Sequence, residues 1–352
     1  MSEMGGCDGE VVDAAMVRQA VEVLLRGGLV AFPTETVYGL GADADQPRAV
    51  AAIFQAKGRP KTHPLIIHLA QAGAVPRWAR HIPAPAQILM RRFWPGPLTL
   101  VLARTPRATD LLTGGQDTVA LRCPANGWAQ CLIRGLCAAR GDESAAIAAP
   151  SANRYGRISP TRAAHVRADL GEKPNGLVDY IIEGGATALG IESTIVDFAG
   201  EVTRILRPGS IDRAQIAAAI GKDVQIVTEA VATPRVSGRV SGHYAPSKPL
   251  ELVEAEELIA RAKSVQALAL GVLAPRQLLE KMQATNLAMA IATAASPQEY
   301  ARLLYEHLRA LDASAAQRLL VAMPPSGEKW EAVHDRLRRA AAGSEGRMID
   351  AD

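Results

Sequence analysis

The sequence predicts an α/β protein in two parts, an N-terminal part with a mixed β-sheet and a smaller C-terminal part with a parallel sheet. Residues 29–206 contain short apolar strands with few regular helix–strand alternations, whereas residues 250–342 alternate strand and helix throughout. Residues 231–249, rich in Pro, Ser and Gly, separate the two patterns and have the composition of a linker. The length of 352 residues allows two domains at ~150 residues each.

The N-terminal part begins with a predicted helix over residues 12–27. Val17, Val21 and Leu24 recur at helical spacing, and two glycines end the pattern. A short helix is expected at 49–56. Apolar runs bounded by Pro or Gly predict strands at 29–32, 64–69, 98–102, 118–122, 145–149, 177–182, 193–197 and 203–206.

The C-terminal part has the alternation that is typical of a parallel sheet between helical layers. It has no Gly-x-Gly-x-x-Gly motif, so it gives no direct indication of nucleotide binding. Strands are expected at 250–253, 267–273, 287–291 and 318–322, and helices at 255–264, 276–283, 297–312 and 328–342.

Composition excludes several classes of protein. No run of ~18 apolar residues is present, so no membrane span is expected. The acidic N-terminus does not resemble a secretory signal, and the four cysteines form no Cys-x-x-Cys pair, which favours a cytoplasmic protein with reduced thiols. Walker A, His-Glu-x-x-His and Gly-x-Ser-x-Gly motifs are absent from the sequence.

Positive charge is concentrated in one segment. Between residues 46 and 122 there are eleven basic and two acidic residues, a net charge of +9. This excess favours a polyanionic partner, either a nucleotide or a nucleic acid, although a solvated basic face is the plainer interpretation.

Polar residues follow several of the predicted strands, where α/β proteins commonly keep their sites. Pro33-Thr-Glu-Thr-Val-Tyr-Gly-Leu-Gly41 combines hydroxyls, a carboxylate and glycines. Ala149-Pro-Ser-Ala-Asn153, Gly190-Ile-Glu-Ser-Thr194 and Leu206-Arg-Pro-Gly209 also lie at strand ends. Each alone is equally compatible with a simple turn.

Lys57-Gly-Arg-Pro-Lys-Thr-His-Pro64 brings two cations close together on a segment stiffened by proline. Such a pair suits a di- or triphosphate, because Arg can grip two oxygens while Lys supplies a point charge. His68, within an apolar run, is more typical of a hydrogen-bonded core residue than of a ligand.

Together these ordered motifs resemble the Sua5/YrdC/YciO family, whose hallmarks include the Lys-x-Arg and Ser-x-Asn pairs. His243-Tyr-Ala-Pro246, followed by a small α/β domain, resembles its longer, two-domain Sua5 branch. The resemblance implies a YrdC-like twisted mixed sheet with a basic cavity and a Rossmann-like C-terminal domain. It implies a catalytic domain at 1–221, a linker or lid at 222–247 and the second domain at 248–352.

The resemblance also implies an activity, that of a threonylcarbamoyl-AMP synthase. The expected substrates are L-threonine, bicarbonate or CO2, and ATP; the expected products are threonylcarbamoyl-AMP and pyrophosphate. Mg2+ is expected to enter with the ATP phosphates, without a protein metal site. The product would serve the t6A modification at position 37 of tRNA, so functional coupling to a tRNA threonylcarbamoyl transferase is expected, with weak tRNA or RNA binding a further possibility.

Residue roles carry over from the same resemblance. Lys57 and Arg59 are the expected catalytic residues and would hold the ATP phosphates together with Arg207. The expected threonine-binding residues are Thr36, His68, Arg122, Ala149 and Ser193. The remaining expected ATP-binding residues are His63, Ser151, Asn153, Ser159 and Tyr244, the last on the linker.

Two departures accompany the resemblance. The family often has Asn where this chain has His63, whose charge would vary near neutral pH. Residues 137–143 resemble a short insertion and are expected to form a surface loop. Two other functions stay open: an RNA-binding module, and a scaffold whose second domain binds a partner. A carbamoyl-transfer enzyme of hydrogenase maturation is disfavoured, because such proteins carry acylphosphatase and zinc-finger segments and this sequence has neither.

Overall fold

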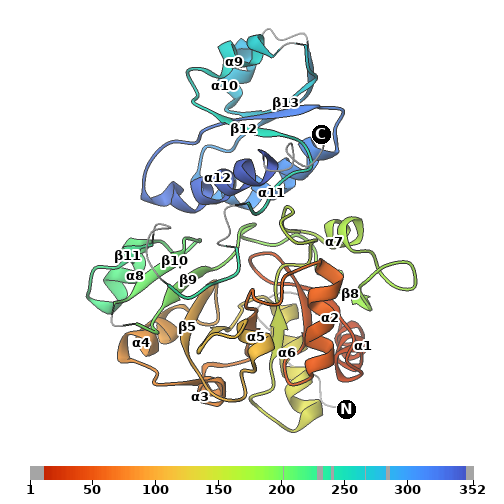
Figure 1. Cartoon of the computed structure of the whole chain (residues 1–352), viewed down its shortest axis with the longest axis vertical. Coiled ribbons are helices and arrows are strands. Elements are labelled where there is room, and N and C mark those ends of the chain that lie inside the picture. The colour runs from red at the N-terminus through yellow and green to blue at the C-terminus, as the bar shows by residue number, and fades with distance from the viewer. Residues whose placement is uncertain are drawn as a thin grey trace. The chain divides into compact units, whose positions relative to one another are not determined.

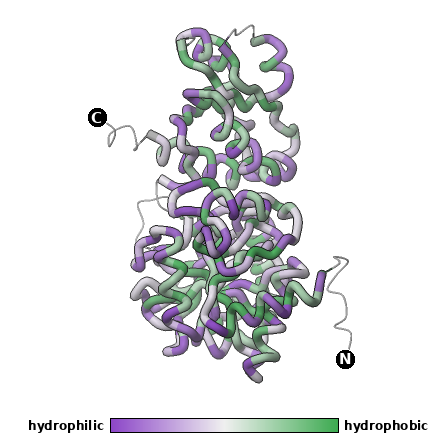
Figure 2. The backbone as a smooth tube through the Cα atoms, turned by 90° about the vertical axis from the view of Figure 1, so that its right-hand side faces the viewer, coloured by the Kyte–Doolittle hydropathy of each residue, from purple (hydrophilic) through white to green (hydrophobic). Residues whose placement is uncertain are grey.

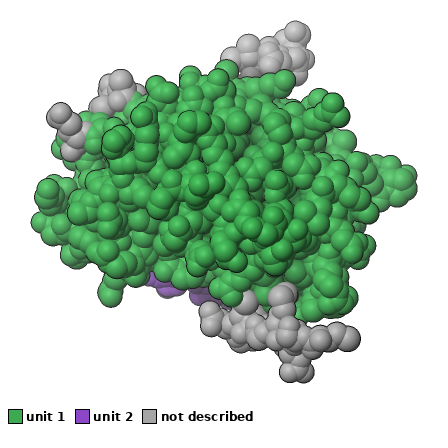
Figure 3. Space-filling view, turned by 90° about the horizontal axis from the view of Figure 1, so that it is seen from below, with its two compact units in different colours: residues 1–155, 160–188, 192–239 green, residues 156–159, 189–191, 240–352 purple. Residues whose placement is uncertain are grey.

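The computed structural model describes residues 12–200, 202–227, 233–238, 242–265, 267–282 and 286–345. The chain divides into two units: unit 1 comprises residues 1–155, 160–188 and 192–239, and unit 2 comprises 156–159, 189–191 and 240–352. Figure 3 colours the residues of each unit. Each unit has its own sheet, as predicted; the predicted domain boundaries at 221 and 247 stay a prediction.

Unit 1 is built on a large mixed sheet of strand order β11-β10-β9-β5-β6-β3-β7-β2-β1-β8, with β4 paired to β5. Parallel and antiparallel neighbours both occur, as the irregular alternation predicted. Its strands are β1 (Val30–Pro33), β2 (Tyr38–Asp43), β3 (Ile66–His68), β4 (Ala79–Arg80), β5 (Leu98–Arg104), β6 (Thr118–Arg122), β7 (Ile147–Ala149), β8 (Tyr180–Ile181), β9 (Thr194–Asp197), β10 (Arg204–Arg207) and β11 (Gln225–Ile226). Its helices are α1 (Ala14–Leu25), α2 (Pro47–Lys57), η1 (Ala72–Ala74), α3 (Val75–Trp78), α4 (Ala84–Phe93), α5 (Asp110–Thr113), α6 (Gly127–Arg140), α7 (Ala163–Asp169) and α8 (Arg213–Ile220).

The two faces of this sheet are covered differently. One face packs into the largest core, to which β5 contributes Leu98, Leu100 and Leu102 and α2 contributes Ile53 and Phe54. The opposite face is covered by α1 and α6 only over the end that carries β1 and β7. Over β5, β6 and β9 that face instead carries a small apolar cluster and polar side chains. The line of polar side chains described below, which runs through β5, β6 and β3, lies on this less covered face.

Unit 2 contains a four-stranded sheet of order β12-β15-β13-β14, parallel throughout. Helices α9 and α10 lie on one side of the sheet and α11 and α12 on the other, which gives the predicted three layers (Figure 1). Its elements are β12 (Leu250–Val253), α9 (Leu258–Ser264), β13 (Leu270–Ala274), α10 (Arg276–Lys281), β14 (Leu287–Ala292), α11 (Pro297–Ala313), β15 (Arg318–Ala322), η2 (Glu328–Trp330) and α12 (Glu331–Glu345).

Hydropathy explains this arrangement within each unit. Figure 2 shows apolar stretches of chain inside each unit with hydrophilic stretches around them. In α11, Tyr300, Leu304, Leu308 and Leu311 recur at helical spacing and are buried, so one stripe of the helix faces the sheet. Burial of that stripe is the main favourable term that docks the helix.

Several elements of unit 1 were not predicted from the sequence, among them α4, α7 and α8. Strand β2 and helix α6 show why. Residues 38–43, expected within a turn, form strand β2, where a Cβ on Gly41 would lie 2.7 Å from the Phe32 ring. Glycine is therefore required by packing there, although it resembles a turn signal in sequence. Helix α6 was not predicted, and residues 137–140 of the expected loop form its last turn, which ends at Gly141. Nine of its fourteen residues are buried, so its apolar positions show no simple helical period.

Candidate functional site

A line of polar side chains crosses the middle of the unit 1 sheet. Thr99 in β5 pairs with Arg122 in β6, and Arg122 pairs with His68 in β3. Paired residues on neighbouring strands project to the same face, so all three side chains lie on the less covered face. Each is at most 4% exposed. Three adjacent strands thus present a hydroxyl, a guanidinium and an imidazole side by side.

The loop between β1 and β2 meets this line at Arg122. The Arg122 Nη1 donates to the Thr36 Oγ1 at 2.9 Å, and its Nη2 lies 2.7 Å from the Glu35 carboxylate. Thr34 holds the loop by donating its hydroxyl to the Val37 carbonyl at 2.8 Å. A buried cation is thereby compensated by one carboxylate and one hydroxyl.

A second cluster lies where β5, β9 and β10 adjoin. The Thr99 and Ser193 hydroxyl oxygens are 2.7 Å apart. The Arg207 Nη2 donates to the Ser193 Oγ at 3.1 Å, and its Nε and Nη2 both donate to the Ser193 carbonyl. Arg207 Nη1 reaches the carbonyl of Ser237 at 2.8 Å, so a described part of the predicted linker is fixed beside this cluster. Val236 joins the apolar cluster on the same face.

His68 is held neutral by its surroundings. Burial and the nearby Arg122 lower the pKa of His68 to about 3, although its Nδ1 contact with the Ile66 carbonyl, 3.2 Å away, opposes that shift. The ring meets Phe32 edge-on, with the ring centroids 6.1 Å apart. At neutral pH, His68 therefore offers hydrogen bonds and no charge.

Lys57 connects the end of α2 to the loop after β7. Its Nζ donates to the carbonyl oxygen of Ser151 at 2.6 Å and to that of Asn153, and the side chain is buried. Burial and the neighbouring Arg59 hold the pKa of Lys57 well below its ordinary value, with Asp169 opposing. An ammonium has three donors. Two backbone carbonyls therefore leave one N–H bond of Lys57 for a ligand.

Arg59 lies beside two aromatic side chains. Its Nη2 donates to the Pro64 carbonyl at 2.9 Å, and its guanidinium carbon is 5.7 Å from the centre of the Tyr155 ring. The Tyr155 hydroxyl is 3.0 Å from the Nδ1 of His63. Burial, Arg59 and Arg235 lower the pKa of His63, so the imidazole is neutral at pH 7. Burial, together with the two arginines, therefore suppresses the variable charge expected at this position.

The two groups of residues meet at the end of β7. Ala149, the last residue of that strand, pairs with Ile66 in β3. Ser151, two residues later, bridges to Gly39 in β2 and accepts the Lys57 hydrogen bond. A line of polar groups, in which the one cation, Arg122, is paired with Glu35, therefore adjoins the buried cations Lys57 and Arg59. This arrangement suits a small polar ligand next to a polyanion.

Two predicted residues belong to unit 2. Ser159 is buried, and Arg309 donates to its carbonyl oxygen at 3.4 Å. Tyr244 adopts a left-handed backbone with φ 64°, and its ring stacks on Tyr305 at 5.6 Å between centroids. The Arg336 guanidinium lies 5.3 Å from the centre of the same ring. The expected contact of both residues with ATP stays a prediction.

Sequence reasoning missed Thr99, Glu35 and Tyr155. Glu35 stands inside a motif that the sequence analysis singled out, and Tyr155 lies two residues after another, so proximity to Thr36 and Asn153 was the available signal. Thr99 lies within a predicted apolar strand, and only the sheet register reveals it.

The basic segment is also less uniform than its net charge indicates. Lys57, Arg59 and Arg122 lie with the site, whereas Arg107 pairs with Asp45 and Asp142 elsewhere. Among the described residues, Arg77, Arg80, Arg91 and Arg92 are exposed and form no ion pair.

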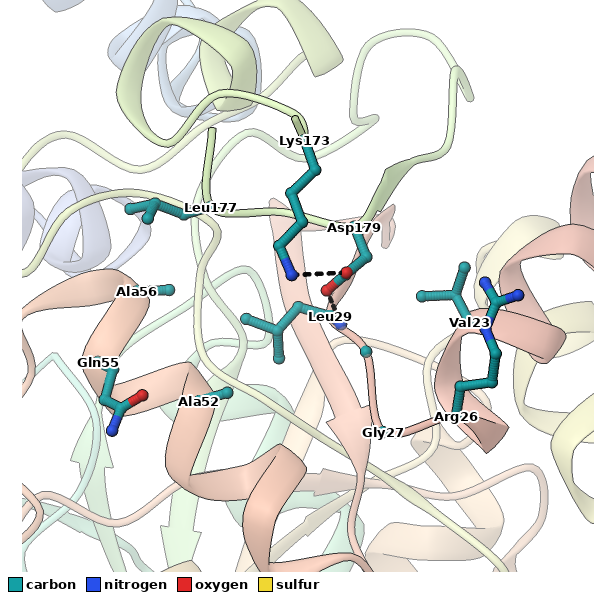
Figure 4. Close-up of a pocket in the computed structure, with 11 residues that line it drawn as sticks. Val23, Arg26, Gly27, Leu29, Ala52, Gln55, Ala56, Lys173, Leu177 and Asp179 are labelled. Carbon is teal, nitrogen blue, oxygen red and sulfur yellow. Dashed lines mark hydrogen bonds and ion pairs between the residues drawn. The ribbon is translucent and has the colours of Figure 1, made fainter. Parts of the chain in front are cut away.

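A separate pocket of about 460 Å³ opens between α1, α2 and the loop before β8 (Figure 4). Lys173 and Asp179 form an ion pair of 2.8 Å at its edge, and Asp179 also accepts the backbone N–H of Leu29. None of the predicted site residues lines it.

The described part of the chain lacks two kinds of feature. It contains no helix long and apolar enough to span a membrane. It also contains no group of three or more His, Cys, Asp or Glu residues placed to bind a metal ion. Cys123, Cys131 and Cys137 are buried free thiols, and Cys7 lies outside the described residues.

Comparison with known proteins gives consistent matches over both units. Residues 22–209 match the Sua5/YciO/YrdC family model, described as telomere recombination. Residues 211–342 match a model described as the C-terminal domain of threonylcarbamoyl-AMP synthase.

Relatives match over nearly their whole length. The threonylcarbamoyl-AMP synthase of Pyrococcus abyssi is 38% identical over 94% of this chain and 96% of its own. That of Bacillus subtilis is 36% identical over 93% of each chain. The crystal structure of P. abyssi Sua5 complexed with L-threonine superposes with a TM-score of 0.83, at 36% identity, over 95% of this chain and 96% of that one.

Proposed function

The chain belongs to the Sua5/YciO/YrdC family of threonylcarbamoyl-AMP synthases, and we propose that its buried polar line and buried cations together hold L-threonine and ATP for that reaction. The enzyme is a nucleotidyltransferase that makes threonylcarbamoyl-AMP. The observation that carries the residue assignment is the junction at the end of β7, where a polar line suited to an amino acid adjoins the buried cations Lys57 and Arg59, which suit phosphates.

Threonine is assigned to the polar line. Thr36, His68, Arg122 and Ser193 supply two hydroxyls, a neutral imidazole and a guanidinium, with the Ala149 backbone alongside. The P. abyssi relative has been crystallised with L-threonine, which supports an amino-acid subsite in this fold.

The ATP phosphates are assigned to Lys57, Arg59 and Arg207. Lys57 has one N–H bond to offer, and Arg can bind two phosphate oxygens at once. Ser151, Asn153 and Ser159 position the nucleotide, and His63 replaces the family's amide with a neutral imidazole that can still donate a hydrogen bond. Tyr244 stays the expected ATP-binding residue of the linker.

Mg2+ is assigned to the substrate and not to a protein site. The described residues offer no carboxylate cluster for it, and Mg2+ usually binds nucleotides through phosphate oxygens. Bound there, the ion would offset negative charge on the departing pyrophosphate.

The chemistry needs no protein nucleophile. The threonine amine attacks CO2 and loses a proton to give a carbamate, and a carbamate oxygen then attacks the α-phosphorus of ATP as pyrophosphate leaves. Catalysis then consists of holding the carbamate beside the phosphate and of stabilising charge on the leaving group. Burial of the site residues also limits hydrolysis of the carbamate and the adenylate.

The cellular role follows from the product. An acyl adenylate decays in water, so we propose that this enzyme is functionally coupled to the tRNA threonylcarbamoyl transferase that makes t6A37, with both proteins in the cytoplasm. Weak RNA binding by the exposed arginines is compatible with that role.

Pyrophosphate release tests the function. With ATP and Mg2+ present, release should require both L-threonine and bicarbonate, and removal of the divalent ion by a chelator should abolish it. Pyrophosphate release that continues when L-threonine or bicarbonate is omitted would contradict the assignment. So would the absence of any release with all substrates present. Salt-sensitive RNA binding in the absence of such activity would favour an RNA-binding protein.

The cation assignment has its own test. Lys57→Met and Arg59→Ala should each lower the rate of synthesis about a hundredfold, or ~3 kcal/mol, because each removes one preorganised contact to the phosphates. Arg77→Ala, on an exposed and unpaired arginine, is the matched control and should leave the rate unchanged. Circular dichroism checks that the variants fold; wild-type turnover in either site variant would refute its role.

A further inference from the structure

One face of helix α11 contacts the two short segments of unit 2, 156–159 and 244–248, that each carry a predicted ATP-binding residue. Tyr305, Arg309 and Asp312 follow one another on α11 at spacings of four and three residues, so their side chains share this face. Each of the three contacts at least one of the two segments. We call these three residues the α11 stripe.

Arg309 holds the first segment by its main chain. The Nη2 of Arg309 donates to the Ile158 carbonyl, and its Nε donates to the Ser159 carbonyl at 3.4 Å. A guanidinium can bind two acceptors together because its donors are fixed in one plane. Since both acceptors are backbone atoms, Arg309 fixes the main chain of Ser159 and thereby limits where its hydroxyl can reach.

Asp312 joins the second segment to the first. Its Oδ1 accepts the backbone N–H and the hydroxyl of Ser247, at 2.7 and 2.6 Å. Its Oδ2 lies 3.5 Å from the Arg157 Nη2. The two segments also contact each other, since the Ala245 N–H donates to the Gly156 carbonyl at 2.9 Å. Movement of either segment would therefore break contacts to the other and to α11.

Tyr244 has a backbone conformation that needs this support. Its φ of 64° lies in the left-handed region, where the Cβ of an L-residue crowds its own main chain. Such a conformation persists only where the surroundings impose it, and it is found most often at functional sites. Tyr305 stacks on the Tyr244 ring, and Arg336 lies 5.3 Å from the centre of that ring. The α11 stripe thus supports both predicted ATP-binding residues of unit 2.

We propose that Arg309 and Asp312 are positioning residues for ATP, which hold Ser159 and Tyr244 in the places from which these residues contact the nucleotide. Arg309 acts through backbone carbonyls, and Asp312 acts through Ser247 and Arg157. The inference rests on the proposed function, which takes Ser159 and Tyr244 as ATP-binding residues.

Substitutions on α11 separate positioning from folding. Arg309→Met keeps the length of the side chain without its donors and should raise the KM for ATP about tenfold, the size expected for one hydrogen bond to a charged group. The KM for L-threonine should stay within about twofold of the wild type. Arg302→Met, on an exposed arginine of the same helix, is the matched control and should leave both KM values unchanged.

Asp312→Ala tests the second segment. It should also raise the KM for ATP and not that for L-threonine, and it carries the test should Arg309→Met fail to fold. In a Ser159→Ala background, Arg309→Met should raise the KM for ATP less than it does in the wild type, because the hydroxyl that it positions is already absent.

Three results would overturn the proposal. They are a lower melting temperature with an unchanged KM for ATP in either α11 variant, an equal rise in the two KM values, and additive effects of Arg309→Met and Ser159→Ala. A wild-type protein without threonine-dependent pyrophosphate release would instead overturn the proposed function, and this inference with it.

Discussion

Buried polar side chains set the character of this site at the residue scale. Lys57, Arg122 and Arg207 are each less than 5% exposed, an unusual environment for a cation. Each is compensated differently: Lys57 by backbone carbonyls, Arg122 by Glu35 and Thr36, and Arg207 by the carbonyls of two serines. Such groups are costly to bury, so their retention together favours a role in binding anions.

His68 supplies a pH prediction. Its folded-state pKa of about 3 lies below the ordinary value of 6.5, so the unfolded chain binds the extra proton as the pH falls. Stability from this group is present above pH 6.5 and is lost progressively toward pH 3. Between pH 7.5 and pH 5 the wild type should lose about 2 kcal/mol more unfolding free energy than His68→Gln.

Denaturant unfolding of both proteins at the two pH values measures this difference. Equal losses in the wild type and His68→Gln would mean that the buried imidazole does not control the pH dependence.

At the scale of elements, the end of α2 places both predicted catalytic cations. Lys57 is the last residue of the helix, and Gly58 follows it in a left-handed conformation with φ 64°. Two backbone hydrogen bonds close this turn, from Gly58 to the Gln55 carbonyl and from Arg59 to the Phe54 carbonyl. The left-handed turn at Gly58 therefore sets the positions of Lys57 and Arg59, which flank it.

Gly58→Ala tests that geometry. No atom lies within 4 Å of the added Cβ, so the cost is backbone strain alone, about 1 kcal/mol. Relaxation of the turn should also shift the cations and raise the KM for ATP severalfold. Gly221→Ala is the matched control, because Gly221 caps α8 with φ 66° in equally open space. It should cost similar stability and leave the KM unchanged; equal KM values in both variants would contradict a positioning role for Gly58.

Elements also show where sequence patterns have limits. Strands β5, β6 and β9 were predicted within a few residues of their ends, because short apolar runs bounded by Pro or Gly have few alternatives. Strand β2 was missed because close packing requires its glycine, and α6 because burial on most sides hides its period.

At the scale of the whole molecule, each unit has an apolar core of its own. In unit 1 the main core contains Leu100 and Leu121, and in unit 2 a core contains Val272 and Leu320. A separate core is what allows a part of a chain to open or unfold by itself.

Core truncation tests that independence. Leu304→Ala, at a fully buried position of α11, should cost 2–5 kcal/mol and speed amide exchange mainly in peptides from 250–345. Leu121→Ala, at an equally buried position of β6, should speed exchange mainly in unit 1. Hydrogen exchange read by mass spectrometry separates the two. Acceleration of both units by either variant would show a single cooperative molecule instead.

The sequence by itself determined the two-part α/β organisation, most strand positions and the motifs that identify the family. Those features are local: apolar periodicity, turn residues and short motifs are written in consecutive residues. It also pointed to Lys57 and Arg59 as a cation pair, because they are neighbours in the chain.

The neighbours of each site side chain in space depend on the tertiary fold. Arg122 lies 23 residues from Thr99 and 54 residues from His68 in the sequence, and only the register of the strands brings the three side chains into line. The burial that neutralises His68 and the hydrogen-bond partners of Ser193, Thr99 and Arg207, come from segments distant in the chain. Proton positions and pKa shifts depend on neighbours in space, which no local sequence pattern records.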